Sequence, residues 1–276
     1  MSQQPPGWYP DPANTLALRF WDGAAWTSHV ATPTATPAER GLHPSLPIEV
    51  AYGALLAMAV PLVASRFVLR ALAEFKWPIA VYVVLLAVLA YGPPLWFWWY
   101  ASKRWGSGAL RTDIGLTATR SDIGWGPVTW LGCVAAQVVV AIIVMATKIP
   151  IQNNTDQIRD ARDNPGYVIP ILIIAVIAAP IVEEILFRGL VLRGLLSRMG
   201  PAWAIGVQAV LFGAAHFDPA RGVRNIGLVM VLSAVGGVLG YSAFHFRRLA
   251  PNMIAHAIIN GISMAFVLSG WAPGSQ

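Results

Sequence analysis

Two adjacent glutamates and an arginine lie inside the apolar stretch IVEEILFRGL at residues 181–190. Charged side chains near the middle of a membrane helix cost about 3 kcal/mol each, so they seldom persist there without a function. Glu184 and Arg188 are four residues apart and can pair on one helix face. Glu183 is rotated from Glu184 by about 100° and stays outside that pair. A carboxylate in a low-dielectric cavity has the raised basicity that a general base needs.

Three more polar side chains stand in later apolar stretches. His216 follows Phe212 by four residues, so the phenyl ring is expected to wall a cavity and fix the imidazole. His256 and Asn260 have the same spacing, and both offer N–H donors of the kind that form an oxyanion hole. Glutamate and histidine to activate water, with histidine and asparagine to stabilise an oxyanion, are the groups that hydrolyse an amide. Water is the expected nucleophile, because no serine or cysteine belongs to the set.

Neighbouring helices must bring these groups together. The stretches that carry Glu183 and His216 are joined by SRMGPA at residues 197–202, where Gly200 and Pro201 predict a tight reversal. Glu183 lies 17 residues before Gly200 and His216 lies 16 after it. An antiparallel hairpin therefore places the two side chains at nearly equal depth, with a mismatch of about 1.5 Å.

The last apolar stretch follows the link RRLAP at residues 247–251, so His256 and Asn260 lie one to two helical turns beyond that link. The apolar part of the glutamate-bearing stretch ends near Arg188. We therefore expect all these polar groups one to two turns inside the same membrane boundary, around one buried cavity.

The composition indicates a polytopic membrane protein. The chain has 276 residues, of which 56% are hydrophobic and only 12% charged, with a mean hydropathy of +0.58. A soluble domain carries about 25% charged residues. The net charge of +6 is better explained by membrane topology than by nucleic-acid binding, and we expect no nucleic-acid partner. The single cysteine, Cys133, excludes an intramolecular disulfide and a cysteine-based zinc site.

Seven apolar runs are long enough to suggest about seven transmembrane helices in an all-α fold. The second contains YGPPLW at residues 91–96 and is expected to kink, end early or re-enter the membrane. The polar segment 147–165 is expected to be an exposed loop. The last four runs, within residues 166–269, form the expected four-helix catalytic core. The runs are 48–65, 77–101, 125–146, 166–187, 201–217, 225–246 and 250–269.

The N-terminal part differs from this membrane region at 48–269. Residues 1–30 hold the turn formers and tryptophans of GWYPDP and WDGAAWT, which predict a very small β-rich soluble domain. A Pro/Thr/Ala-rich linker follows at 31–47. The two motifs resemble those of a small domain of unknown function that is common in actinobacterial membrane proteins.

The distribution of lysine and arginine predicts the orientation. Eleven of them fall on the side that holds the N-terminus and the links after the second, fourth and sixth runs, and eight fall on the other side. The positive-inside rule then places the N-terminus in the cytoplasm. With the actinobacterial resemblance, we expect an integral protein of a bacterial plasma membrane.

The three polar motifs resemble those of the CPBP family, which includes CAAX prenyl proteases and bacteriocin-processing or Abi proteins. The family pattern EExxxR, FxxxH and HxxxN is met in order along three predicted helices. The resemblance implies an all-helical membrane protease whose conical cavity opens toward the cytosol. It implies that Glu183 and His216 activate water, that His256 and Asn260 stabilise the tetrahedral intermediate, and that Arg188 holds Glu184. The motif residues are Glu183, Glu184, Arg188, Phe212, His216, His256 and Asn260.

Metal dependence stays open at this point. Family members are commonly described as metalloproteases, and Glu183, His216 and His256 are able to supply the three protein ligands of a catalytic zinc. The eukaryotic-type members resemble glutamate-dependent enzymes instead. No HExxH motif is present, and Asn260 beside His256 suits a pair of hydrogen-bond donors better than a ligand shell. We favour the metal-independent interpretation.

The leading hypothesis is an intramembrane endopeptidase acting on a membrane-embedded or membrane-anchored peptide or protein. A membrane-anchored peptide or bacteriocin-like precursor suits an actinobacterial chain better than a prenylated protein does. One alternative is a non-catalytic binding or immunity protein that holds a peptide in the cavity. Another is a proton-coupled transporter, against which the absence of an internal sequence repeat argues.

Overall fold

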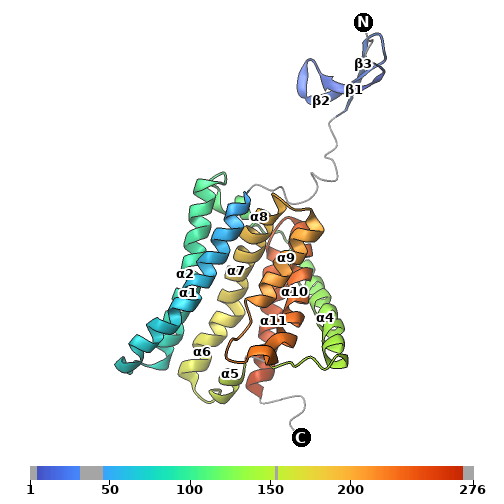
Figure 1. Ribbon diagram of the computed structural model, residues 1–276. Coiled ribbons are helices and arrows are strands. Elements are labelled where there is room, and N and C mark those ends of the chain that lie inside the picture. The colour runs from blue at the N-terminus through green and yellow to red at the C-terminus, as the bar shows by residue number, and fades with distance from the viewer. Residues whose placement is uncertain (1–4, 32–45, 153–154, 270–276) are drawn as a thin grey trace. The chain divides into compact units, whose positions relative to one another are not determined.

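The computed structural model describes residues 5–31, 46–152 and 155–269. The chain divides into two compact units, residues 1–41 and 42–276. Within the described ranges the first unit contains strands and the second contains helices (Figure 1). This confirms the expected polytopic helical protein with a small β-rich N-terminal part. Most of the expected linker, at residues 32–45, lies outside the described residues.

The N-terminal unit is an antiparallel sheet with the strand order β1-β2-β3. Asp22 Oδ1 accepts two backbone N–H groups of the turn between β2 and β3, both at 2.7 Å, and Gly23 has a φ of +100°. The rings of Trp21 and Trp26 meet edge to face with centroids 5.4 Å apart, and such aromatic pairs help to stabilise so small a sheet. The strands are β1 Gly7–Asp11, β2 Asn14–Trp21 and β3 Trp26–Ala31.

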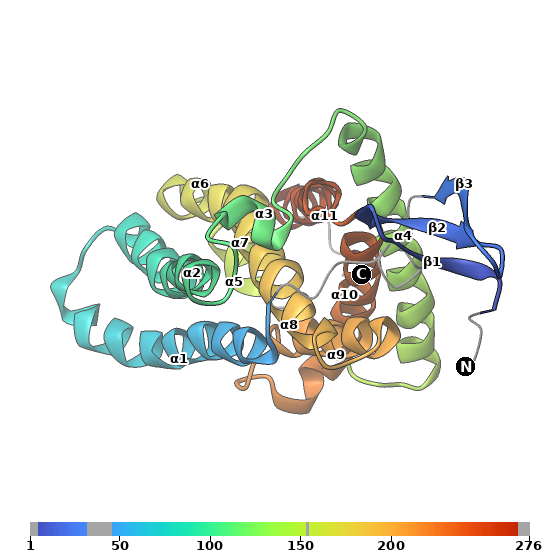
Figure 2. The ribbon, with the colours of Figure 1, turned by 90° about the horizontal axis from the view of Figure 1, so that it is seen from above.

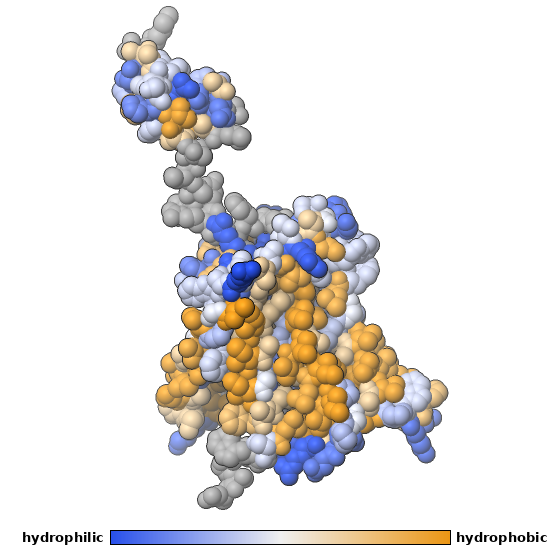
Figure 3. Space-filling view, turned by 180° about the vertical axis from the view of Figure 1, so that it is seen from behind, coloured by the Kyte–Doolittle hydropathy of each residue, from blue (hydrophilic) through white to orange (hydrophobic). Residues whose placement is uncertain are grey.

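Within the described part of the chain, six helices are long and apolar enough to cross a membrane. On the face of the helical unit in Figure 3, apolar residues form a broad band with hydrophilic residues gathered at both ends. This pattern is that of a protein embedded in a bilayer. The six candidate spans are Ile48–Phe75, Ile79–Arg104, Asp122–Ala146, Pro165–Leu196, Gly222–Phe246 and Ala250–Ser269.

The fourth span is divided among several helical elements, and short elements connect the others. The elements of the helical unit are α1 Ile48–Leu72, η2 Ala73–Phe75, α2 Ile79–Arg104, α3 Leu110–Ile114, α4 Asp122–Ala146, α5 Asp156–Asp160, α6 Pro165–Ile173, η3 Ile174–Ala178, α7 Ala179–Glu184, η4 Ile185–Val191, α8 Leu192–Leu196, α9 Pro201–Ala214, η5 Gly222–Asn225, α10 Ile226–Phe246 and α11 Ala250–Ser269.

The fifth apolar run forms only the 14-residue helix α9. A bilayer crossing needs about 20 residues, so the prediction of a seventh full-length span at 201–217 is wrong. The helix stops because Asp218 and Pro219 start a turn, in which Asp218 Oδ1 accepts the N–H of Ala220 at 2.9 Å. The apolar residues just before this turn no longer belong to the helix.

The second apolar run forms an unbroken helix. α2 continues through Pro93 and Pro94 to Arg104, so the expected early end or re-entrant path is wrong. Each proline removes one backbone donor, but α2 remains helical through both and packs along α1. Phe97 of α2 fits against Gly53 of α1 so closely that any side chain at position 53 would overlap its ring.

Seen from above, α1 and α2 lie on one side of the helical unit and α4, α10 and α11 on the other, with α7 and α8 between them (Figure 2). Small residues permit close approach in this arrangement. A Cβ added to Gly236 of α10 would lie 3.0 Å from the backbone oxygen of Ala209 in α9. In this arrangement, neighbouring helices surround the helix that carries the two glutamates.

Candidate active site

The two glutamates end α7, between two π-helical segments, η3 and η4. Glu184 is completely buried, and its Oε1 accepts hydrogen bonds from Arg188 at 2.8 Å and from His256 Nδ1 at 3.1 Å. Its Oε2 accepts one from Asn252 at 3.1 Å. The predicted pair of Glu184 and Arg188 is therefore present, and the carboxylate also holds α11 through His256 and Asn252.

Arg188 is as completely buried as its partner. Its second terminal nitrogen donates to the backbone oxygen of Gly236 in α10 at 3.2 Å. Its guanidinium carbon lies 4.4 Å from the ring centroid of Phe212 in α9, a cation–π contact. Arg188 thus connects three helices around one neutralised carboxylate.

Glu183 points into a different environment, with its side chain 20% exposed. Its Oε2 lies 3.9 Å from Nε2 of His216 and 3.9 Å from Nε2 of His256. That Oε2 atom has no hydrogen-bond partner within the described part of the chain. The hairpin of α7–α8 and α9 therefore brings Glu183 and His216 together, as the spacing around Gly200 predicts, and α11 adds His256.

The two imidazoles are oriented through their Nδ1 atoms. His216 Nδ1 lies 2.9 Å from the backbone oxygen of Phe212, and His256 Nδ1 contacts the Glu184 carboxylate. Both partners are acceptors, so Nδ1 carries the proton in each ring. In the neutral rings, Nε2 is then a lone-pair acceptor facing Glu183. Phe212 fixes His216 through this backbone bond and through its ring, whose centroid is 5.0 Å from that of the imidazole.

Asn260 lies one helical turn beyond His256 on α11 and lines the same cavity. One of its side-chain N–H groups donates to the backbone oxygen of Ala175 in η3 at 2.8 Å. A carboxamide nitrogen has two N–H groups, so this bond orients the amide and leaves the second N–H available. The structure therefore gathers Glu183, His216, His256 and Asn260, whereas Glu184 and Arg188 lie behind them.

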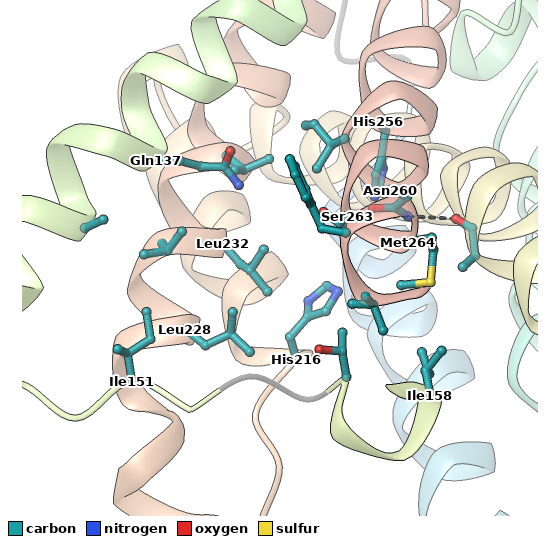
Figure 4. A pocket seen from close by; sticks show the side chains of 18 of the residues that line it. Gln137, Ile151, Ile158, His216, Leu228, Leu232, His256, Asn260, Ser263 and Met264 are labelled. Atoms are coloured by element: carbon teal, nitrogen blue, oxygen red, sulfur yellow. Dashed lines mark hydrogen bonds between the residues drawn. The ribbon is translucent and has the colours of Figure 1, made fainter. Parts of the chain in front are cut away.

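The cavity has a volume of about 690 Å³ and mostly apolar walls from α4, α10 and α11 (Figure 4). It extends from Glu183 to residues Ile151, Thr155 and Ile158, next to and within α5. Arg221 helps to hold α5 there by pairing with Asp156 at 2.9 Å. The hydrogen bonds of Arg221 to Asp156 and Asp218 raise the pKa of its guanidinium further.

The helical span that carries the glutamates is longer than the sequence predicts. The glutamate-bearing span continues to Leu196 and does not end near Arg188, because Arg188 is neutralised inside the bundle and marks no boundary. At 1.5 Å per residue, Glu183 lies about 20 Å from that helix end. Glu183 therefore lies near the middle of its helical span, and a depth of one to two turns inside the membrane boundary stays a prediction.

The cavity extends from Glu183 away from the start of α1. The backbone at Pro47, which precedes α1, lies beside Gly194 of α8, whereas Pro150 accepts a hydrogen bond from Gly227 at the start of α10, the end that holds α5. In Figure 1 α1 and α9 begin at one end of the helical unit and α5 lies at the other. The cavity therefore extends toward the end opposite the start of α1, whereas the sequence predicts a cytoplasmic N-terminus together with a cavity open to the cytosol.

In the described ranges, no group of three or more His, Cys, Asp or Glu side chains is arranged to hold a metal ion. The zinc ligands considered above are Glu183, His216 and His256. Glu183 Oε2 lies 3.9 Å from Nε2 of His216 and 3.9 Å from Nε2 of His256. Ligands of a tetrahedral zinc at about 2.0–2.1 Å from the ion would be about 3.4 Å apart. As placed, these side chains do not fit the metal.

Asn252 is a site residue that the sequence motifs did not reveal. It is fully buried, and its amide nitrogen bridges Glu184 Oε2 and the backbone oxygen of Leu239, the latter at 2.6 Å. Its signal in the sequence is its spacing: Asn252 precedes His256 by four residues and so shares its helix face.

Two segments of the chain match known families. Residues 165–262 match the family described as Type II CAAX prenyl endopeptidase Rce1-like, and residues 6–39 match DUF2510, a family of unknown function. No curated protein and no solved structure matches the chain. The chain is therefore similar to the Rce1-like CAAX endopeptidase family over residues 165–262 and to DUF2510 over residues 6–39.

Proposed function

We propose that this protein is an intramembrane endopeptidase that hydrolyses a peptide bond of a membrane-associated protein or peptide. The observation that carries the proposal is the position of Glu183 Oε2, 3.9 Å from Nε2 of both His216 and His256, in a largely apolar cavity within the spans. The CAAX endopeptidase family of residues 165–262 supports the same class of reaction.

The distances suit a water molecule held between these atoms. A separation of 3.9 Å is too long for a direct hydrogen bond, but two bonds of about 2.8 Å through one water span about 4 to 5 Å. Glu183 accepts one water proton and His216 Nε2 accepts the other. A lone pair of the water oxygen is then directed into the cavity, toward the substrate.

The proposed reaction uses the same groups in sequence. The water oxygen attacks the scissile carbonyl carbon while its proton passes to Glu183, and the carbonyl electron pair moves to oxygen. Asn260 donates a hydrogen bond to that oxyanion, and His256, whose Nδ1–H stays bonded to Glu184, donates a second one from Nε2 if that nitrogen also carries a proton. The proton on Glu183 then passes to the amide nitrogen, the C–N bond breaks, and a carboxylic acid and an amine are released.

Glu184, Arg188 and Phe212 are positioning residues in this scheme, since none of them reaches the reacting atoms. Glu184 orients the imidazole of His256, Arg188 compensates the charge of Glu184, and Phe212 orients His216. We further propose that the protein resides in a bacterial plasma membrane with a cytoplasmic N-terminus, where the bilayer and an anchored substrate are its partners.

The proposal is tested with the purified full chain in liposomes and internally quenched peptides, with and without a farnesylated cysteine near the C-terminus. Cleavage of at least one peptide, identified by mass spectrometry, is the expected result. The Glu183→Gln protein, prepared identically, controls for contaminating proteases. Equal cleavage by both proteins, or by neither, contradicts the proposal.

Removal of metal ions is expected to leave the cleavage rate unchanged. The reason is the donor geometry, which does not fit a tetrahedral zinc, together with a water site made of protein groups alone. The measurement is the initial rate after incubation with EDTA and with 1,10-phenanthroline, followed by dialysis. A loss of activity that added zinc restores would show that the side chains rearrange around a metal.

Asn252→Ala is expected to lower kcat by about tenfold while KM stays within about twofold, because Glu184 loses one of the hydrogen bonds that fix it under His256. Gln208→Ala is the matched control, since Gln208 is a fully buried amide that does not contact Glu184. If both variants lose thermal stability alike and keep kcat, Asn252 has only a structural role. Asn252→Ser, which retains a donor, is expected to recover part of kcat.

A further inference from the structure

Gln137 is a polar side chain in an otherwise apolar part of α4. From Trp130 to Ala146, all residues of this helix except Gln137 are apolar, glycine or the single cysteine. The residue lies outside the Rce1-like match, and the three sequence motifs do not include it. Polar side chains within membrane spans are costly and usually face a partner or a cavity.

The carboxamide of Gln137 faces the cavity and makes no hydrogen bond to another described residue. It belongs to the cavity wall with Val138 and Ala141 of the same helix, both apolar. Thr129, a polar residue nearer the start of α4, instead pairs with Ser242 of α10 across 3.3 Å. Gln137 therefore differs from a polar residue whose function is to join helices.

Across the cavity, α11 presents a line of polar side chains. His256, Asn260 and Ser263 follow at intervals of four and three residues, which places them on one helix face. Figure 4 shows Gln137 extending from α4 toward this face of α11. A substrate peptide lying along α11 beside the proposed site would have α11 along one edge and Gln137 of α4 along the opposite edge.

A peptide main chain that enters this cavity loses the water around its N–H and C=O groups. An unpaired amide in an apolar surrounding costs about 2 kcal/mol or more. A carboxamide offers both an acceptor and two donors, so it can bind the C=O and the N–H of an extended substrate together. No aliphatic wall residue can do so.

We propose that Gln137 binds the main chain of the substrate next to the scissile bond, accepting from an N–H and donating to a C=O. This inference rests on the proposed function, since it names the peptide backbone as the ligand of the same cavity. It assigns to α4 a binding residue that is independent of side-chain sequence in the substrate. The side chains of the substrate then contact the apolar walls.

The test is a binding measurement that does not require turnover. The full chain with Glu183→Gln is reconstituted in nanodiscs and titrated against two fluorescein-labelled peptides, one ending in a farnesylated cysteine plus three residues and one lacking the farnesyl group. Replacement of Gln137 by Leu is expected to raise Kd for the tighter peptide by about tenfold, the loss of one to two hydrogen bonds. Thr129→Val, the matched control on α4, is expected to leave Kd within about twofold.

Ester substitution identifies the bonded group. Each peptide bond of the ligand is replaced in turn by an ester, which removes an N–H and weakens the C=O. At one position of the peptide, the ester is expected to raise Kd for the protein that retains Gln137. The same ester is expected to leave Kd unchanged for the Gln137→Leu protein. Gln137→Met, a flexible apolar replacement, is expected to behave as Gln137→Leu does and so excludes a packing effect.

Unchanged Kd in Gln137→Leu, ester effects that persist in it, or no binding of either peptide would overturn the inference. The rate of peptide cleavage by the chain with Glu183 intact reports on the proposed function separately. Binding that depends on Gln137, without any cleavage, would support the binding role and contradict the hydrolase.

Discussion

Glu183→Gln is expected to lower kcat for peptide cleavage by about 10² to 10⁴-fold with little change in KM. Glutamine keeps the size and most of the polarity of the side chain but cannot take a proton from water. The Oε2 atom concerned is the one that lies 3.9 Å from both imidazole Nε2 atoms. Initial rates with the best-cleaved reporter peptide, at substrate concentrations that bracket KM, give the two constants separately.

The control for this variant is Glu74→Gln, which changes an exposed glutamate of η2 that does not line the cavity. Its kcat should equal that of the unaltered protein. A proteomic comparison of membranes with the two variants should reveal a precursor that accumulates only with Glu183→Gln. Unaltered kcat in Glu183→Gln would remove Glu183 from the reaction, and unaltered biological activity without cleavage would favour a peptide-binding protein.

The largest effect on stability is expected from Arg188→Met. This change leaves the Glu184 carboxylate fully buried without its ion-pair partner, and breaking a buried pair costs about 3–5 kcal/mol. The contact of the guanidinium with the Phe212 ring is lost as well. Reversible unfolding in mixed detergent micelles, followed by circular dichroism, measures the change in the free energy of unfolding.

The double variant Glu184→Gln with Arg188→Met removes both charges and should recover part of the lost stability, which isolates the pairing energy. Arg159→Met is the comparison at a half-exposed ion pair with Asp156, where the expected loss is below about 1 kcal/mol. Equal stability of Arg188→Met and the unaltered protein would mean that Glu184 is buried without its charge.

The convergence of the site could be predicted from the sequence because it depends on counting residues along helices. The equal spacing of Glu183 and His216 around Gly200 is preserved in the structure, and the four-residue spacing of Glu184 and Arg188 produced their ion pair. Both relations survive small changes in helix geometry. For the same reason, most of the apolar runs became membrane-length helices.

The rest depends on features that hydrophobic patterning does not encode. The π-helical segments η3 and η4 differ from α-helix by about one residue per turn, which is too little to change the apolar pattern. The contacts of Glu184 with His256 and Asn252 depend on how α7 and α11 are rotated about their axes. The buried Arg188 was mistaken for a boundary because composition does not show that a charge is paired.

The end at which the cavity opens determines which side of the membrane receives the cleaved polypeptide. The cavity extends from Glu183 toward α5, at the end opposite the start of α1. If the protein is the proposed endopeptidase and the cavity opens at the α5 end, a cytoplasmic N-terminus, as the lysine and arginine distribution predicts, would release the newly made termini outside the cell. Such an enzyme would process exported or envelope proteins. With the opposite membrane orientation it would process membrane-anchored proteins inside the cell.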